Sequence, residues 1–100
     1  MTRGSTPTHV FTLPFGTDII KTIEITYAQK DVVKVRKTNE DCTFEGNTVS
    51  TKLTQEETFK FSVDAVIEMQ IRVLTIDGDA IPSNIMYDTC NDSLSDEVLK

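Results

Sequence analysis

A chain of 100 residues with 38% hydrophobic residues and no Trp has room for one domain with a single core, built mostly from Ile, Val, Leu and Phe. Sixteen acidic residues against ten basic ones give a net charge of -6, which argues against nucleic acid as a partner, because Lys and Arg must neutralise a phosphate backbone. The charge is uneven, since most basic residues lie at or before Lys37 and most acidic residues follow it.

The opening residues are polar and lack the apolar run of a signal peptide. No later stretch approaches the roughly 20 apolar residues of a membrane span. We therefore expect a protein made in the cytoplasm, with no membrane partner and soluble unless it is assembled into a larger particle. In that compartment Cys42 and Cys90 are expected to stay free, buried thiols.

Residues 1–8 are predicted to be a flexible lead, because Pro7 and small polar residues disfavour both helix and strand. A short strand follows over His9–Leu13. Val10 lies on one of its faces and the flanking odd-numbered residues on the other. Pro14 comes directly after the strand, which favours a position at a sheet edge.

The clearest strand covers Lys21–Gln29, where apolar and polar residues alternate. Lys30-Asp31 turns the chain back into Val32–Lys37, and the two strands predict an antiparallel hairpin. In the second strand two valines are expected to face the core and two basic residues to face solvent, namely Val33, Val35, Lys34 and Arg36.

The middle of the chain predicts another hairpin, around the tight turn Glu45-Gly46-Asn47, followed by a single helical turn. In the strand after the tight turn, Thr48–Leu53, every second side chain is expected to face the core. The sequence Thr54-Gln55-Glu56-Glu57 has the form of a capping box, in which Thr54 and Glu57 exchange side-chain hydrogen bonds with the backbone. Phe59 and Phe61 follow and are expected to point into the core.

Residues 66–88 predict a long central hairpin across Asp77-Gly78, a pair typical of a type I′ turn with positive φ at both central residues. Strict alternation over residues 67–73 gives the first strand one buried face. In the second strand Ile85 and Tyr87 fall on the apolar parity and Met86 on the polar one. The acidic residues 91–100 are predicted to be a flexible tail.

About seven strands at spacings of roughly 8–12 residues, with one short helical turn, predict an all-β, immunoglobulin-like antiparallel β-sandwich that forms a single domain over residues 1–100. A small barrel is the competing architecture.

No arrangement of residues in the sequence predicts catalysis, a cofactor or a metal site. His9 is the only histidine and is expected at the surface or at a sheet edge, without a partner that would make it a general base. Asp77-Gly78-Asp79 lacks the carboxylate spacing of a calcium loop. Cys42 would need a histidine within reach to act as a nucleophile. We therefore predict that the protein is not an enzyme.

Basic residues gather near the Lys30-Asp31 turn and along the strand after it. They are expected either to dock an acidic neighbour, such as residues 88–97 of another copy, or to form a solvated edge that blocks unwanted strand pairing. The two ends of the chain are further candidates for protein contacts. The individual residues predicted for protein contact are Lys34, Arg36, Lys37 and His9.

Three segments carry a resemblance to a family: MTRGSTPTHVFTLPF, EDCTFEGNTVSTKLTQEETFKF and IEMQIRVLTIDGDAIPSNI. They resemble small proteins encoded in phages and prophages of Gram-positive bacteria, often among virion genes. The strand plan is also similar to the immunoglobulin-like N-terminal module of phage baseplate upper proteins, although no receptor-binding extension follows the last hairpin here.

The resemblance implies a non-enzymatic structural protein of a tail, baseplate or head–tail region. Such a protein would be made in the host cytoplasm and assembled into a particle. Its partners would be other virion proteins or copies of itself, in which case it would form a homo-oligomer. One alternative is a carbohydrate-binding β-sandwich. The absence of Trp counts against it, and its only possible stacking aromatics, Tyr27, Tyr87 and Phe44, are more easily placed in the core. Another is a small acidic regulatory or inhibitory phage protein that mimics nucleic acid.

Overall fold

Period-two alternation of apolar and polar residues marks the central strands of this chain, and strands, which make up about half of it, pair into two antiparallel sheets. The structure is a computed structural model that describes residues 1–100. One sheet holds β1 (Thr8–Thr12), β5 (Thr48–Lys52) and β4 (Cys42–Glu45), in that order. The other holds β3 (Val32–Thr38), β2 (Ile20–Gln29), β6 (Ile67–Thr75) and β7 (Ala80–Pro82), with β8 (Met86–Asp88) also paired to β6.

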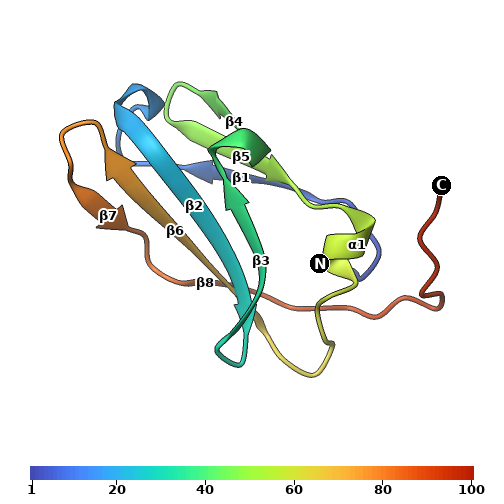
Figure 1. Cartoon of the computed structure of the whole chain (residues 1–100). Helices are drawn as coiled ribbons and strands as arrows, with labels where there is room; N and C mark the ends of the chain where they lie inside the picture. Colours follow the sequence, from blue (N-terminus) through green and yellow to red (C-terminus); the bar gives the residue numbers. More distant parts are fainter.

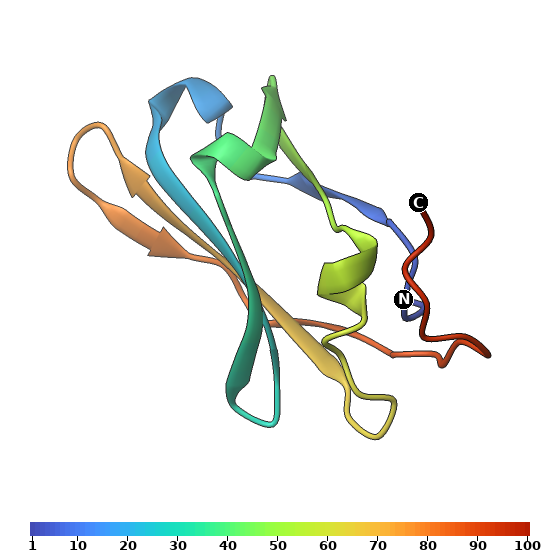
Figure 2. The ribbon, with the colours of Figure 1, turned by 45° about the vertical axis from the view of Figure 1, so that its right-hand side comes forward.

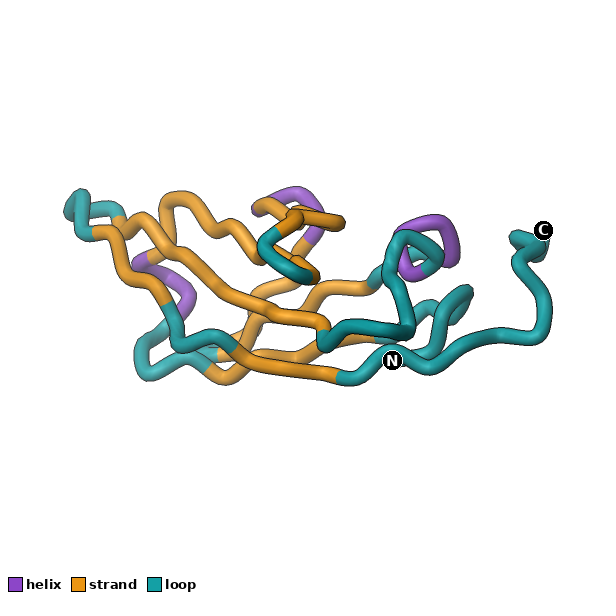
Figure 3. Tube along the Cα trace, turned by 90° about the horizontal axis from the view of Figure 1, so that it is seen from below, coloured by secondary structure: helices purple, strands orange, loops and turns teal.

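The two sheets stack as two layers, which Figure 3 shows from below. Short 3-10 turns, Thr17–Ile19 and Asn39–Asp41, lead into β2 and β4, and the single helical turn α1 (Gln55–Thr58) precedes β6 (Figures 1 and 2). The predicted all-β sandwich with one helical turn is therefore confirmed. No helix in the structure has the length and apolar character needed to span a membrane.

The order of the strands follows the plan of an immunoglobulin sandwich. Strands β1 to β7 take the positions B, C, C′, D, E, F and G, since B, E and D share one sheet and C′, C, F and G share the other. The position of strand A, on the outer side of β1, is not filled by any strand of this chain.

The core lies between the sheets and is built from the inward parity of the central strands. The predicted alternation is confirmed over residues 23–29 and 67–73, where the odd-numbered side chains of both strands are buried, whereas Lys21 at the start of β2 is exposed. The capping box at Thr54 and Glu57 is also present and starts α1. The fully buried side chains of the core include Ile23, Ile25, Tyr27, Val49, Leu53, Phe61 and Ile67.

The facing predicted for β3 is wrong at Val33, because of a β-bulge. Val35 pairs with Tyr27 but Val33 pairs with Ala28, so Lys34 is the extra residue. The extra residue turns Val33 to the outer face of the sheet, where it is 47% exposed, whereas Val35 remains buried.

The last strand is in two pieces, which reverses the predicted facing of its second half. Ser83 replaces a regular ladder residue: its backbone N–H donates to the Ile71 carbonyl at 2.7 Å, and its side-chain Oγ accepts from the Ile71 N–H at 2.9 Å. Ile81 pairs with Val73 but Tyr87 pairs with Glu68, so one residue has been inserted between β7 and β8. Met86 consequently packs on the core and Tyr87 is 65% exposed, the opposite of the prediction.

The two hairpin turns differ from the predicted turn chemistry. Asp77-Gly78 is not a type I′ turn, because only Gly78 has a positive φ, of 92°. The Thr75 Oγ1 accepts from the Asp79 N–H instead and closes a wider turn. Positive φ at both central residues occurs at Lys30 (49°) and Asp31 (65°), between the paired residues Gln29 and Val32.

Replacing Asp31 with Gly is expected to stabilise the fold by about 0.5–1 kcal/mol, because Gly adopts positive φ without the steric cost that a Cβ imposes. Urea unfolding at neutral pH measures the change. Asp77→Gly is the matched control, since Asp77 also lies in a hairpin turn but has no positive φ. An equal gain in both variants would contradict the explanation.

The lead, residues 1–8, and the tail, residues 91–100, both predicted to be flexible, contact each other and the domain in the structure. They lie side by side near α1 (Figure 2), where the Arg3 N–H donates to the Asn91 carbonyl at 2.9 Å. Gly4 follows with φ of 80°, and the ring of Phe59 lies 2.5 Å from where a Cβ would be, so only glycine allows this close approach.

The Arg3 side chain joins the lead to the rest of the domain. Its guanidinium stacks over the Phe59 ring at 5.4 Å from the centroid and donates to the Phe59 carbonyl at 3.1 Å. It also pairs with Asp92 at 3.1 Å and with Asp96 at 3.5 Å. The acidic tail therefore contacts a basic residue of its own chain.

Candidate protein-contact face

The side of the five-stranded sheet that points away from the core is the candidate site, and we call it the outer face. Antiparallel pairing places Glu24 of β2 opposite Arg72 of β6, and Thr26 opposite Arg36 of β3. These side chains have the parity opposite to the buried ones, so they stand on the solvent side. The outer face comprises Thr22, Glu24, Thr26, Val33, Arg36, Glu68, Gln70, Arg72, Leu74, Ile85 and Tyr87.

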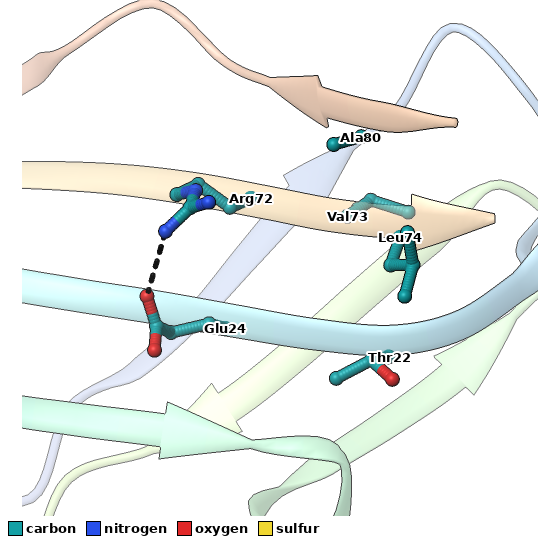
Figure 4. Close-up of a pocket in the computed structure, with 6 residues that line it drawn as sticks. All are labelled: Thr22, Glu24, Arg72, Val73, Leu74 and Ala80. Atoms are coloured by element: carbon teal, nitrogen blue, oxygen red, sulfur yellow. Dashed lines mark ion pairs between the residues drawn. The ribbon is translucent and has the colours of Figure 1, made fainter. Parts of the chain in front are cut away.

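A charged triad lies across the middle of the outer face. The Glu24 carboxylate forms an ion pair with Arg36, whose Nε lies at 3.2 Å, and a longer one with Arg72, whose Nη1 lies at 3.9 Å. Figure 4 shows the second pair, bridging β2 and β6. The two arginines are 55% and 66% exposed, so these pairs contribute little to stability. Glu68 also stands on the outer face, so the two arginines are balanced by two carboxylates, and the charge that remains is that of Lys34 at the neighbouring bulge.

Two shallow hollows adjoin at this triad, because Glu24 and Arg72 line both of them. The first lies toward the β6–β7 end and includes Leu74 and Ala80 (Figure 4). The second extends toward Ile85. The outer face is therefore slightly concave along β2 and β6, with charged groups at its centre.

Large exposed apolar and aromatic side chains border the charged triad. Tyr87 is 65% exposed, Ile85 is 45% exposed and Val33 is 47% exposed, and all three stand on the outer face. Exposed Arg and Tyr beside aliphatic groups are the composition that marks the energetic centres of protein–protein interfaces. The outer face thus carries polar anchors and apolar area on a rigid sheet.

The structure divides the four residues predicted for protein contact into two groups. Arg36 lies on the outer face, and Lys34 lies half-exposed at the bulge on the same edge strand. Lys37 and His9 do not belong to this surface, because both point between the sheets. The alternation along β3 is enough to predict that Arg36 is exposed. Lys37 is buried against Glu57 and His9 is partly buried against Tyr27. These partners lie in distant parts of the chain, so the pattern of a single strand does not predict the burial.

Lys37 is 6% exposed, and its prediction as a surface contact residue is wrong. Its Nζ donates to the Glu57 Oε1 of α1 at 2.6 Å, and the same oxygen accepts from the Thr54 N–H in the capping box. Burial alone would raise the pKa of Glu57, but the hydrogen bonds from Lys37 and Thr54 outweigh it and lower that pKa. The ion pair therefore ties β3 to the start of α1.

His9 was expected at the surface or at an edge, and the edge position of β1 is confirmed. The imidazole, however, is half-buried and faces the opposite sheet, with Nδ1 2.7 Å from the Tyr27 hydroxyl. Burial raises the pKa of Tyr27 far above its usual range, so the phenol keeps its proton and can donate to a neutral imidazole. Burial also lowers the pKa of His9, an effect that the nearby Asp88 carboxylate only partly offsets.

The lowered pKa of His9 predicts a loss of stability in mild acid. The contribution of neutral His9 is complete above the unfolded pKa of 6.5 and is lost as the pH falls toward the folded value, because the unfolded chain binds the proton more readily. We expect His9→Gln to flatten the dependence of the unfolding free energy on pH between about 7.5 and 5.5. Urea unfolding across that range measures it, and an unchanged slope would contradict the assignment.

The two cysteines and the possible metal ligands do not form a reactive site. Cys42 and Cys90 are not bonded to each other, and burial raises the pKa of both thiols. No group of three or more potential metal ligands gathers anywhere in the structure.

Three residues of structural or surface importance were not singled out in the sequence. Arg72 lies at an even-numbered, outward-facing position of β6, so the alternation of that strand already predicts that it is exposed. Gln29 has the inward parity of β2 and is 3% exposed, with three side-chain hydrogen bonds to the loop after α1. Arg3 had no local signal, because its partners follow it by more than 50 residues.

Comparisons of the chain with protein-family models, with curated proteins and with solved structures find no match.

Proposed function

We propose that this protein is a non-enzymatic structural component of a phage or prophage particle, in a tail, baseplate or head–tail region, and that it works by protein–protein contact. The phage assignment is supported by the resemblance of the three sequence segments described above. The contact role is supported by the outer face, where Arg36, Arg72 and Tyr87 are exposed on a rigid sheet.

The partner surface that fits the outer face is acidic with some apolar area. Two arginines flank one carboxylate, so a carboxylate from a partner can take the place of Glu24 beside either guanidinium. Tyr87 and Ile85 then supply the apolar contact that charges alone do not give. Lys34 and Arg36 make β3 the basic side of the outer face, where an acidic partner group would bind.

The test is whether the protein is part of a particle. A tagged copy is expressed in a bacterial strain that carries the gene in a prophage, the prophage is induced, and particles are purified on a density gradient. We expect the tagged protein to sediment with the particles. Detection only among free soluble proteins would overturn the phage assignment.

Charge reversal then tests the contact face. Lys34→Glu/Arg36→Glu/Arg72→Glu is expected to remove the protein from purified particles. Because Arg72→Glu puts a second carboxylate opposite Glu24, a modest fall in melting temperature is expected, and a circular dichroism spectrum like that of the unchanged protein shows that the variant is folded. Lys60→Glu/Lys100→Glu is the control, with two charge reversals outside both sheets. Retention of the triple variant in the particles would show that another surface makes the contact.

One observation favours a second candidate function, binding of carbohydrate. Tyr87 was expected in the core but is exposed, and Glu68, its neighbour on β6, lies at the second hollow with Gln70. An exposed ring beside carboxylate and amide groups suits stacking and hydrogen bonding to a sugar. A glycan array with Tyr87→Ala as the control tests it, and absence of signal for the unchanged protein would exclude it.

A further inference from the structure

The outer edge of β1 is the least protected sheet edge in the molecule. On the opposite sheet, β3 is interrupted by the bulge at Lys34 and carries further basic side chains, which obstruct strand addition. The β7–β8 edge is broken at Ser83 and contains Pro82, which cannot donate a hydrogen bond. On the three-stranded sheet, β4 has only four residues and ends at Glu45.

Strand β1, by contrast, reads THVFT and has no charge, no proline and no bulge in its pairing with β5. Its outward side chains, Thr8, Val10 and Thr12, are all exposed, and Val10 is 62% exposed. β-branched residues of this kind favour an extended, paired strand. The usual devices that keep an edge strand from pairing with another chain are therefore absent from β1.

The ladder with β5 shows which backbone groups of β1 are free. Just outside the strand, the Leu53 N–H donates to the Pro7 carbonyl at 3.0 Å and the Leu13 N–H donates to the Asn47 carbonyl at 2.8 Å. Bonded residues alternate in an antiparallel ladder, so the odd-numbered residues of β1 face β5. The N–H and C=O groups of Thr8, Val10 and Thr12 point to the open side.

The space beside this edge is also open. A small apolar groove between the two sheets is lined by Leu13 and Phe15, which follow β1, and by Ile81 and Pro82 of β7. In an immunoglobulin sandwich strand A lies along this side of strand B. Here residues 1–3 run instead beside Asn91, so the chain does not cover the β1 edge itself.

We propose that two copies of this chain associate through their β1 strands, paired antiparallel around a twofold axis at Val10. This arrangement joins the two three-stranded sheets into one, in the order β4-β5-β1-β1-β5-β4. It does not rest on the proposed phage function, because both partners are copies of this chain and the outer face takes no part.

The register follows from the free groups. With Val10 opposite Val10 of the second copy, Thr8 lies opposite Thr12, and every free N–H and C=O of both edges finds a partner, in about six hydrogen bonds. A register centred on any other residue leaves some of these groups unpaired. On the inner side His9 then lies opposite Phe11 of the second copy, an aromatic pair.

A second copy fits this edge because the sequence of β1 is complementary to itself. Its cross-strand neighbours are Val with Val and Thr with Thr, which are favourable pairs, and no like charges meet. The strand is short, so we expect a weak dimer that forms as protein concentration rises. Each copy carries a net charge of -6, so added salt should strengthen the dimer slightly by screening repulsion.

Sedimentation equilibrium from micromolar to millimolar protein, at low and moderate salt, tests the proposal. Val10→Lys and Val10→Glu are each expected to raise the dissociation constant of the dimer roughly tenfold or more, because like charges meet across the axis. An equimolar mixture of the two variants should restore association, since Lys then faces Glu. Val32→Lys is the control, an exposed valine on the edge strand of the other sheet.

Each other result overturns the proposal. A monomer at every concentration excludes the dimer. A dimer that persists in Val10→Lys, or a mixture that fails to restore association, excludes this register. Association that weakens with salt and with Arg36→Glu, but not with Val10→Lys, places self-contact at the outer face and leaves the proposed function standing without the β1 dimer.

Discussion

Replacing Glu57 with alanine is expected to destabilise the protein by about 3 kcal/mol, a large part of the stability of a domain this size. The change leaves the Lys37 ammonium without its partner, and the side chain of Lys37 is only 8% exposed. It also removes the carboxylate that accepts from the Thr54 N–H at the start of α1. Urea unfolding with circular dichroism measures the loss.

Three further variants separate the ion pair from the capping box. Glu57→Gln keeps a side chain that can accept from Thr54 but removes the charge, so its loss should be smaller than that of Glu57→Ala. Lys37→Met in the Glu57→Ala background should recover part of the loss, because no unpaired ammonium then remains between the sheets. Glu56→Ala, at the exposed neighbouring position, is expected to change stability by less than about 0.5 kcal/mol. No recovery in the double variant would count against the buried ion pair as the cause.

Gln29→Leu is expected to cost about 2–3 kcal/mol, because it leaves three backbone groups of one loop without partners. The Gln29 amide donates to the Ser62 carbonyl at 2.7 Å and to the Ala65 carbonyl at 2.9 Å, and its oxygen accepts from the Ser62 N–H at 2.8 Å. These bonds fix residues 62–65, which carry the chain from α1 into β6.

Urea unfolding measures the global cost of Gln29→Leu, and amide exchange at Ser62 reports the local one. Exchange at Ser62 should accelerate more than exchange in β2, because the amide loses its acceptor directly. Gln70→Leu is the control, since Gln70 is half-exposed on the outer face and makes one side-chain hydrogen bond, to the Ser83 carbonyl. Equal losses in the two variants would contradict the role assigned to Gln29.

The strands that the sequence predicted best are those whose pattern is local. Strict alternation in β2 and β6 determined which residues are buried, and a capping box needs only four consecutive residues. A local pattern could not predict which face of the sheet Val33 and Tyr87 lie on. Each lies near a residue that is inserted in the pairing, and an insertion is a property of two strands together.

The same distinction applies to the candidate site. Arg36 could be placed on the surface from the parity of its own strand. Lysine is a residue type that is mostly exposed and histidine one of intermediate burial. The burial of Lys37 and the partial burial of His9 depend on Glu57 and Tyr27, partners in other elements. The composition of the outer face depends on which strands become neighbours, which the sequence pattern of any single strand does not contain.

The pairing of the lead with the tail also determines how this domain would bear a mechanical load. Thr2 and Asn91 form a parallel bridge, so the two terminal segments run in the same direction. A force that pulls the chain apart by its ends would slide one segment along the other. All their contacts would then be loaded together, including the Arg3–Asn91 hydrogen bond and the Arg3–Asp92 ion pair, rather than opened one after another. Within an assembly under tension, these contacts between the lead and the tail would be the first to resist extension. The core would bear the force only after they broke.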